Sequence, residues 1–275
     1  MGTWNLQNYL LSLRFPEGRF RPDYPKPEAE KQRLREILRQ SRPDILFIQE
    51  LGSAAFLREL QLDLAAGGLD YPFTGFSGVP GTRSGLGFLS RIEPDQVIFH
   101  DPLLTESGLP LPRGLQEVRF ILQGCSWRFF HVHLKSRWSD DPSDPDATIP
   151  RREGLAALAA FLRRIRAADP DSRAVLVGDF NTPHDSPLLN PLRADWIRLL
   201  PAGPSGLRYT YTHRKSASRE ILDGFWILQP GILQPLAILP AGASSAPSDH
   251  RLVLVELSDP SDSPDPSDKS DFPDN

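Results

Sequence analysis

The segment Ala174-Val175-Leu176-Val177-Gly178-Asp179-Phe180-Asn181 is the most informative part of the sequence. Its four apolar residues predict a buried strand that ends at Gly178. Continued alternation would place Asp179 and Asn181 on one side of the chain and Phe180 on the other. A carboxylate and an amide at the open end of a buried strand suit the binding of a metal ion or a water molecule. The same residues are also typical of an Asx turn that closes a strand.

Outward from this strand, apolar patterns predict a chain that alternates strands and helices. Helices are expected at 28–40, around 56–64 and around 155–165, where apolar residues recur at helical spacing. Strands are expected at 3–8, 45–48, 86–90, 118–122, 127–134, 221–228 and 252–257. Because most strands are too close in sequence for a helical crossover, the sheets should be mixed or antiparallel. Four prolines within 16–27 predict an irregular loop, and the polar segment 137–150 predicts another.

Charge distinguishes the body of the chain from its last residues. The 275-residue sequence has 31 basic and 35 acidic residues and a net charge of −4. Residues 258–275 hold six Asp and one Lys, a net charge of −5, which leaves +1 for the rest. Such a body is neither a strongly basic nucleic-acid binder nor an acidic solvating chain. We expect one domain over 1–257 and a disordered acidic Ser/Pro/Asp tail over 258–275, with a calcium-binding or partner-binding arm as the alternative for the tail.

The sequence also excludes several classes of protein. A single cysteine, Cys125, excludes an internal disulfide framework and a zinc site built from cysteines. The longest apolar run, 155–162, is much shorter than the roughly 18–20 residues that span a bilayer, so no membrane span is expected. No signal-peptide pattern precedes Thr3. We therefore expect a soluble protein, either cytoplasmic or exported with a leader absent from this sequence.

A second group of polar residues lies in His131-Val132-His133-Leu134-Lys135-Ser136. Strand alternation places His131, His133 and Lys135 on one face and the two apolar residues on the other, toward the core. Cationic and donor groups in a row suit a phosphate, because they supply positive charge and hydrogen bonds together. A His-x-His pair could instead bind zinc, although no third nitrogen or sulfur ligand has a convincing spacing. The remaining alternative is an exposed polar strand face.

Other polar candidates lie next to further predicted strands. Ser248-Asp249-His250 cannot form a Ser-His-Asp relay, because adjacent strand residues point to opposite sides, and the chain has no Gly-x-Ser-x-Gly elbow. A polar turn is the alternative for this tripeptide. Glu50 ends a buried strand, where an ordinary surface carboxylate is the alternative. Asn5 aligns with Gln7 in the first strand. Asp223 lies among apolar strand residues and needs a partner, because burying an unpaired carboxylate is costly.

The order of these motifs resembles a known family. Over residues 4–250 the sequence contains, in order, Trp-Asn, Gln-Glu, Leu-Ser-Arg, His-x-His-Leu-Lys-Ser, Gly-Asp-Phe-Asn, Leu-Asp-Gly-Phe and Ser-Asp-His. This succession resembles the endonuclease/exonuclease/phosphatase superfamily, which includes pancreatic-type deoxyribonucleases, abasic-site nucleases, inositol polyphosphate phosphatases and neutral sphingomyelinases. The resemblance implies a single α/β domain, a four-layer sandwich of two mixed, mostly antiparallel sheets flanked by helices. The site is then expected at one edge of the sandwich.

The resemblance also implies a metal site. Glu50 matches the principal metal-binding glutamate of the family. Asn5 matches the asparagine of the first strand at the metal and phosphate site, and Asp249 matches an aspartate at the metal. Gln7 departs from the pattern, because some abasic-site nucleases carry an aspartate there for a second metal. Whether the site holds one metal ion or two therefore stays open.

The catalytic residues implied by the resemblance lie in the second half of the chain. Asp179 and Asn181 match the pair that positions the attacking water and the phosphate. His133 matches the histidine that contacts the scissile phosphate in the deoxyribonuclease branch. Asp223 matches the aspartate that orients the final histidine, which is His250. At His131 the family often has an asparagine or another small polar residue.

The expected function is divalent-metal-dependent hydrolysis of a phosphodiester, as a nuclease or on a small diester. Mg²⁺ is the expected cofactor because it binds a few carboxylates and keeps several waters, with Mn²⁺ and Ca²⁺ as alternatives. Lys135 is expected to bind the substrate, as are Arg137 and Arg152 at the two ends of the polar loop. The alternatives are a phosphomonoesterase of the inositol-phosphatase type and a catalytically inactive binding module on the same fold. The expected partner is a phosphate-ester substrate, nucleic acid included, bound by a monomer.

Overall fold

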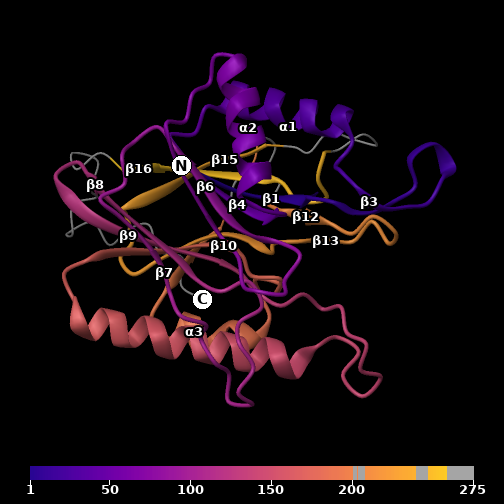
Figure 1. The fold of residues 1–275 in the computed structure, drawn as a ribbon. Coiled ribbons are helices and arrows are strands. Elements are labelled where there is room, and N and C mark those ends of the chain that lie inside the picture. Colours follow the sequence, from indigo (N-terminus) through magenta and orange to yellow (C-terminus); the bar gives the residue numbers. More distant parts are fainter. Residues whose placement is uncertain (201–202, 204–207, 240–246, 259–275) are drawn as a thin grey trace.

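Two six-stranded sheets lie face to face, and helices cover their outer sides (Figure 1). This arrangement confirms the expected four-layer α/β sandwich. The computed structural model describes residues 1–258 apart from 201–202, 204–207 and 240–246. The predicted tail therefore lies, except for Ser258, outside the described residues.

The first sheet has the strand order β15-β16-β1-β4-β6-β5. Its strands are β15 (Leu233–Leu239), β16 (Leu252–Leu257), β1 (Gly2–Tyr9), β4 (Ile45–Leu51), β6 (Gly85–Ser90) and β5 (Phe73–Ser77). Strands β1 and β4 are parallel, and the other neighbouring pairs are antiparallel. The carboxyl ends of β1 and β4 therefore lie beside the amino end of β16 at one edge of the sheet.

The second sheet repeats this arrangement with the order β11-β14-β10-β9-β8-β7. Its strands are β11 (Ile197–Leu199), β14 (Asp223–Ile227), β10 (Arg173–Asp179), β9 (Cys125–His133), β8 (Gln116–Leu122) and β7 (Gln96–Phe99). Strands β9 and β10 are parallel, and the other pairs are antiparallel. The register places Asp179 opposite His133 on one side and opposite Asp223 on the other.

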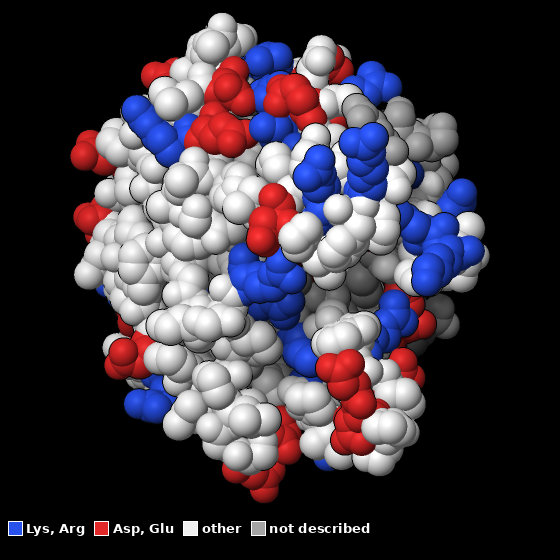
Figure 2. All heavy atoms as spheres, turned by 45° about the vertical axis from the view of Figure 1, so that its right-hand side comes forward, with Lys and Arg blue, Asp and Glu red and all other residues white. Residues whose placement is uncertain are grey.

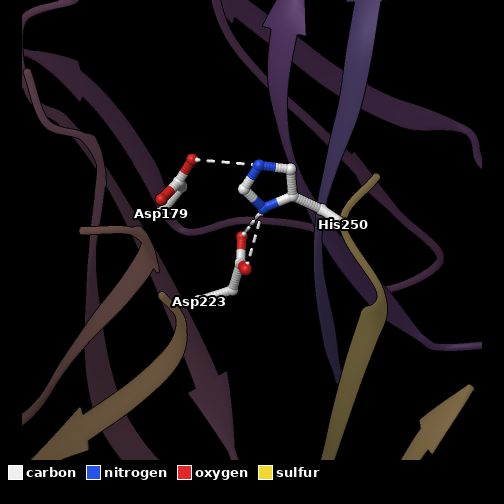
Figure 3. A group of neighbouring side chains, drawn as sticks. All are labelled: Asp179, Asp223 and His250. Atoms are coloured by element: carbon white, nitrogen blue, oxygen red, sulfur yellow. Dashed lines mark hydrogen bonds and ion pairs between the residues drawn. The ribbon is translucent and has the colours of Figure 1, made fainter. Parts of the chain in front are cut away.

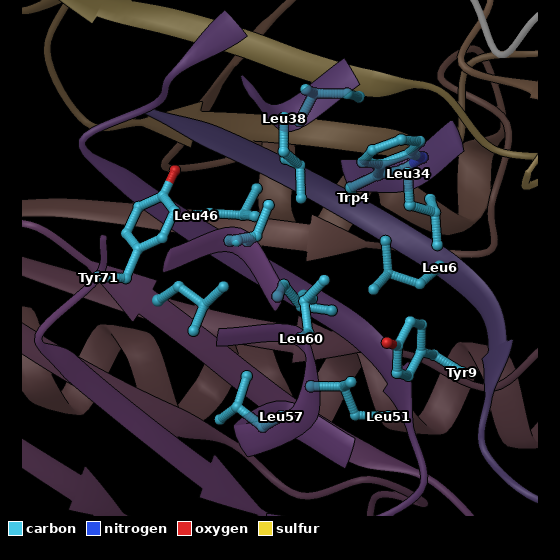
Figure 4. Packing of buried hydrophobic residues seen from close by; sticks show 14 of the residues in the cluster. Trp4, Leu6, Tyr9, Leu34, Leu38, Leu46, Leu51, Leu57, Leu60 and Tyr71 are labelled. Carbon is cyan, nitrogen blue, oxygen red and sulfur yellow. The ribbon is translucent and has the colours of Figure 1, made fainter. Parts of the chain in front are cut away.

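Alternation along the strands of the first sheet produces two of the three core layers. Leu46 and Ile48 of β4 pack beneath α1 (Glu28–Ser41) and α2 (Ala54–Ala66), where Figure 4 shows leucines of both helices over the sheet. Ile45 and Phe47 of the same strand belong to the layer between the two sheets. One strand thus supplies both layers because its side chains alternate with a period of two.

The third core layer lies between the second sheet and α3 (Thr148–Ala168). Phe130 and Leu176 pack there against Leu155 and Leu158 of the helix. Two short helices, η2 (Pro187–Leu189) and α4 (Asn190–Arg193), add Leu189 and Leu192 to this layer. Both faces of the second sheet are therefore covered, as its near-continuous apolar strands require.

The prediction of an irregular loop at 16–27 is wrong in part. A hairpin of β2 (Ser12–Arg14) and β3 (Arg21–Tyr24) occupies much of that segment, with η1 (Pro16–Gly18) between its strands. Proline is tolerated in a two-stranded ribbon, because one side of each strand needs no hydrogen-bond donor. A second ribbon, β12 (Tyr211–Thr212) with β13 (Arg219–Glu220), was also not expected. Strands β5, β7, β11 and β15 were likewise not expected.

The boundary of the polar loop also differs from the expected one. Helix α3 begins at Thr148, whereas the loop was expected to continue to Pro150. Proline is compatible with the first helical turn, where its missing N–H would have no partner. The Asp144 carboxylate accepts the backbone N–H groups of Thr148 and Ile149 at 2.7 and 2.8 Å, which stabilises this earlier start.

Candidate active site

Adjoining strand ends of the two sheets bring together eight residues that the sequence singles out. From the first sheet these are Asn5 on β1, Glu50 on β4, and Asp249 and His250 just before β16. From the second sheet they are His133 on β9, Asp179 on β10, Asn181 beyond it, and Asp223 on β14. A pocket of about 560 Å³ opens at this edge, and its lining includes Glu50, Asn181, Asp249 and His250.

Asp179, Asp223 and His250 form a buried group in which both carboxylates face the imidazole (Figure 3). Nδ1 of His250 donates to the two Asp223 oxygens at 2.9 and 3.0 Å. Nε2 of the same ring lies 3.9 Å from Oδ2 of Asp179. Both aspartates are completely buried and His250 is 5% exposed, so water screens these charges little.

The charges of this group set the protonation state of each member. Burial alone would lower the pKa of His250, but the Asp223 and Asp179 carboxylates raise it well above its ordinary value. Burial and the charge of Asp223 raise the pKa of Asp179, and the opposing effect of His250 is smaller. The site thus combines a protonated imidazole with a carboxylate that accepts protons more readily than an exposed aspartate.

The same three side chains are close enough to be considered as metal ligands. One ligand atom from each lies within 4.8 Å of the others. A histidine must be neutral to coordinate a metal, however, and two carboxylates hold His250 in its protonated form. The group therefore suits proton transfer better than metal binding.

Asn5 connects this group to Glu50. Its Nδ2 donates to Oδ2 of Asp179 at 3.0 Å and to Oε1 of Glu50 at 3.1 Å. Its Oδ1 accepts the backbone N–H of Gln7 at 2.9 Å. Because its amide nitrogen faces Glu50, Asn5 in this orientation holds the carboxylate in place.

The backbone directs Glu50 toward the pocket. The register between β4 and β6 shifts between Gln49 and Leu51, and Glu50 itself has a φ of 63°. A bulge re-aims a side chain, and a left-handed conformation is uncommon for a residue other than glycine. Oε2 of Glu50 accepts the backbone N–H of Asn8 at 2.7 Å. The strained backbone at Glu50 thus directs its carboxylate toward the pocket.

Asp249 is another carboxylate that lines the pocket, as Glu50 does. Burial raises its pKa, His250 acts against this rise, and the charge of Glu50 adds to it. Two carboxylates that repel each other across a pocket fit a divalent cation, which would remove the repulsion and prefers oxygen ligands. Glu50 and Asp249 are therefore the residues that could hold a metal here.

Gly178 and Phe180 fix the position of Asp179 between them. Gly178 has a φ of 138°, and a Cβ there would lie 2.0 Å from the carbonyl oxygen of Val132. Only glycine allows the strand to pair at this point. The Phe180 ring is completely buried and lies 5.7 Å from the Trp226 ring, so Asp179 faces the opposite way.

Asn181 belongs both to the turn that closes β10 and to the pocket lining. Oδ1 of Asp179 accepts the Asn181 backbone N–H at 2.8 Å, which makes the Asx turn that the sequence offered as an alternative. Nδ2 of Asn181 donates to the Leu134 carbonyl at 2.9 Å, and Asn181 also lines the pocket. Closing the strand and presenting the polar groups are therefore compatible.

The two histidines of β9 lie in different environments. His133 is 2% exposed, with Nε2 at 3.5 Å from Oδ2 of Asp179. Burial, together with the charges of Arg113 and His250, holds the pKa of His133 well below its usual range. His131 lies between the sheets, in contact with Gln49 and Gln116, and burial lowers its pKa to about 3. The expected phosphate-binding face therefore does not include His131.

The expected substrate-binding residues differ in where they lie. Arg137 lines the pocket and donates to both oxygens of Glu220. Nζ of Lys135 donates to the carbonyl oxygens of Ser136 and Trp138 instead of facing the pocket. Arg152 is exposed on α3 and is not part of the pocket lining.

Two cationic residues at the site were missed by sequence analysis. Arg113, in the loop before β8, is close enough to Glu50 and Asp179 for their charges to act on its pKa. Nη2 of Arg214, in the β12–β13 turn, donates to Oε1 of Gln7 at 2.5 Å. Both lie in loops without an apolar pattern, so their position near the site is visible only in the folded structure. In Figure 2 the right-hand side of Figure 1 is turned forward, and Lys and Arg side chains lie along the centre and right of that view.

In the described part of the chain, no helix is both long enough and apolar enough to cross a membrane.

Comparisons with solved structures agree with the fold. Sphingomyelinase C from Streptomyces griseocarneus is 18% identical, with a TM-score of 0.64, and the match covers 94% of this chain and 98% of that one. The human Nocturnin catalytic domain with bound sulfate is 16% identical, with a TM-score of 0.64 and 94% coverage of both chains. A Staphylococcus aureus beta toxin variant with bound magnesium ions is 14% identical, with a TM-score of 0.64 and coverage of 94% and 99%.

No curated protein sequence matches the chain. At the identities above, the likeness to solved structures concerns the fold alone. The family model for the Endonuclease/Exonuclease/phosphatase family, however, matches residues 2–250, which is most of the sequence. The chain belongs to the Endonuclease/Exonuclease/phosphatase family.

Proposed function

We propose that this protein is a divalent-metal-dependent phosphodiesterase. The observation that carries the proposal is the buried Asp179–His250–Asp223 group beside the carboxylates of Glu50 and Asp249. Hydrolysis of a phosphate ester needs neutralisation of the phosphoryl charge, an activated water and a proton for the leaving oxygen. The site holds a residue of suitable chemistry for each of these tasks.

Mg²⁺ is the proposed cofactor, with Glu50 and Asp249 as its carboxylate ligands. When bound, the ion would supply positive charge to the phosphate oxygens. Asn5 fixes one oxygen of Glu50, and the Asn8 backbone N–H fixes the other. Gln7 has no carboxylate and is hydrogen-bonded to Arg214, which supports a site for one ion rather than two.

Asp179 is the proposed general base. Its Oδ1 is held by the Asn181 backbone and its Oδ2 by Asn5, so its orientation is fixed. Burial and the nearby Asp223 raise its pKa, which makes it a better proton acceptor. In the proposed reaction Asp179 takes a proton from water, and the water oxygen forms a bond to phosphorus.

His250 is the proposed acid that assists the leaving oxygen. Its Nδ1 is held by Asp223, which leaves Nε2 directed toward Asp179 (Figure 3), and His250 lines the pocket. As the phosphorus–oxygen bond breaks, Nε2 can donate its proton to the developing charge. Asp223 does not meet the substrate in this proposal; it positions the ring and sustains its protonation.

The phosphate oxygens would meet His133, Asn181 and the cations Arg113 and Arg137. Arg137 lines the pocket, whereas Arg113 acts from the loop before β8. Guanidinium groups bind phosphate through several hydrogen bonds at once. Lys135 and Arg152 do not line the pocket itself. Both remain proposed contacts to parts of the substrate outside the pocket.

The test is an activity panel with Mg²⁺ on DNA, RNA, inositol phosphates and sphingomyelin, each repeated with EDTA. The proposal expects turnover of at least one phosphodiester and its loss with EDTA. Turnover of monoesters alone would favour the phosphatase alternative. Binding without turnover of any member would favour an inactive binding module on this fold.

A further inference from the structure

A hairpin beside the pocket exposes an apolar face that the fold leaves uncovered. We use the term N-terminal hairpin for residues 11–24, which contain β2, η1 and β3. Four of its large side chains are exposed: Leu11 by 45%, Leu13 by 58%, Phe15 by 68% and Phe20 by 57%. Exposed apolar side chains are ordinary when scattered, but four on one short ribbon indicate a surface that meets a partner.

The hairpin has opposed arginines on its strands and two aromatic rings at its turn. Arg14 pairs with Arg21 across β2 and β3, and directly opposed residues share one face. Within β2, Leu13 precedes Arg14 by one position and therefore lies on the other face, whereas Phe15 and Phe20 lie just beyond the two strands, at the turn. The Phe15 and Phe20 rings are 5.5 Å apart, which gathers the aromatic surface at the tip of the ribbon.

The base of the hairpin is fixed to the edge of the pocket. Nη2 of Arg14 donates to the Asn8 carbonyl at 2.9 Å, and Nζ of the buried Lys26 donates to the Gln7 carbonyl at 3.1 Å. Gln7 and Asn8 both line the pocket. The apolar tip therefore has a defined position relative to the site and projects from the same side as the β12–β13 ribbon (Figure 1).

Positive charge accompanies the apolar tip. Arg19 and Arg21 are exposed on the hairpin, and Arg214 and Lys215 are exposed on the β12–β13 turn. The two ribbons are neighbours, because Arg214 contacts Gln7 and its charge acts on Arg14 and Lys26. Figure 2 shows basic side chains on this side of the molecule. An apolar tip with a cationic border matches an anionic lipid surface, whose acyl region takes the tip and whose headgroups take the arginines.

We propose that the N-terminal hairpin docks this protein on membranes that contain anionic lipids, with the pocket facing the surface. Two of the four exposed side chains are leucines, which have no aromatic face on which a nucleic-acid base could stack. A second copy of the chain would bring the same positive charge against itself. The docking concerns binding and stands apart from the proposed hydrolysis, so it can fail or hold independently of it.

The test measures co-sedimentation of the full chain with vesicles of phosphatidylcholine, alone or mixed with phosphatidylserine. The wild type should bind the mixed vesicles more strongly than phosphatidylcholine alone, and salt should weaken this binding. The double variant Phe15→Ser/Phe20→Ser should bind the mixed vesicles at least about tenfold more weakly, because two large apolar side chains are lost. Arg19→Gln/Arg21→Gln should lose the preference for phosphatidylserine.

A matched control removes two other exposed apolar side chains. Phe99→Ser/Leu236→Ser changes residues that are each 52% exposed, on the edge strands β7 and β15, and should bind as the wild type does. Equal binding by Phe15→Ser/Phe20→Ser and the wild type would overturn the proposal, as would no vesicle binding by the wild type. Single-stranded oligonucleotide binding that depends on Phe15 and Phe20, without vesicle binding, would also overturn it and assign the hairpin to nucleic acid.

Discussion

At the scale of single residues, the site depends on carboxylates placed in different environments. Asp223 is committed to Nδ1 of His250, whereas Asp179 is held by Asn5 and the Asn181 backbone and keeps a raised pKa. Glu50 and Asp249 line the pocket instead of entering the buried group. Carboxylates therefore serve three purposes here, and the surroundings of each decide which.

Asp179→Asn should abolish most turnover and leave the fold intact. The amide keeps the shape of the side chain but cannot accept a proton, so kcat/KM should fall by at least about 100-fold. The substitution also removes a buried charge that Asp223 repels, so the thermal unfolding midpoint should not fall strongly. Near-wild-type hydrolysis by a folded Asp179→Asn protein would refute the role of Asp179 as the base.

Asp223 and His250 should behave as one unit. Because Asp223 acts only through the imidazole, Asp223→Asn in a His250→Gln background should cost little beyond the single change. The measurement is a double-mutant cycle in kcat with all four proteins. Losses that add in free energy would show that the pair is uncoupled.

Much of this site could be predicted from the sequence, because strand ends and motif order mark it. Asp179, Asn181, Asp223 and His250 follow or begin apolar strands, and the structure brings them together. Arg113 could not be found this way, because its neighbours are Pro112 and Gly114 in a loop without periodicity. Alternation alone also does not determine how deep a strand position lies, so the interior location of His131 was not foreseen.

At the scale of elements, β8 carries a buried charge cluster outside the pocket lining. Glu117 is completely buried, and its oxygens are 2.6–2.8 Å from nitrogens of His100, Arg119 and Arg128. Burial by itself would raise the pKa of Glu117, but hydrogen bonds from these three residues lower it to about 2. The ionised carboxylate thus links β8 and β9 to the chain that follows β7.

Glu117→Gln should therefore destabilise the fold by about 3 kcal/mol, because it leaves buried cations without their charge partner. The folded pKa is depressed, so this stabilisation is complete above the ordinary value of 4.5 and is lost as pH falls toward about 2. Urea unfolding of both proteins at several pH values checks this. A stability difference that stays constant from neutral pH down to about 2 would contradict the assignment.

The polar loop before α3 should influence which substrates reach the pocket. Asp146 lines the pocket, while Asp144 caps the helix, so only part of the acidic charge is free to repel a polyanion. Asp140→Asn/Asp146→Asn should raise kcat/KM on duplex DNA relative to a small diester. Asp144 stays unchanged in this variant to keep the helix cap, and an unchanged ratio would remove the loop from substrate selection.

Elements with long apolar patterns were predicted within a few residues, and short ribbons were not. The strand at 252–257 coincides with β16, and the helix at 28–40 differs from α1 by one residue. The β2–β3 hairpin was missed because Pro16 and Pro22 favour the prediction of a loop. Proline is nevertheless tolerated there, because the exposed side of each strand needs no backbone N–H donor. The apolar side chains of the hairpin also face outward, so they provide no core pattern.

At the scale of the whole molecule, the repeated sheet topology creates the site. Each sheet contains one parallel pair, β1 with β4 and β9 with β10, followed by an antiparallel neighbour. In both sheets these three strands therefore present two carboxyl ends and one amino end at the same edge of the sandwich. Sequence reasoning could anticipate this gathering through the family resemblance, whereas strand patterns alone leave the pairing order open.

The dependence of catalysis on a metal ion can be measured as hydrolysis of bis(p-nitrophenyl) phosphate by EDTA-treated protein while Mg²⁺ is returned. We expect no turnover without the ion and a saturable rise in the rate with it. Glu50→Gln should need at least about tenfold more Mg²⁺ for half-maximal rate, because it removes a carboxylate ligand. Full turnover in EDTA, or the same Mg²⁺ requirement for Glu50→Gln and the wild type, would contradict the proposed metal dependence.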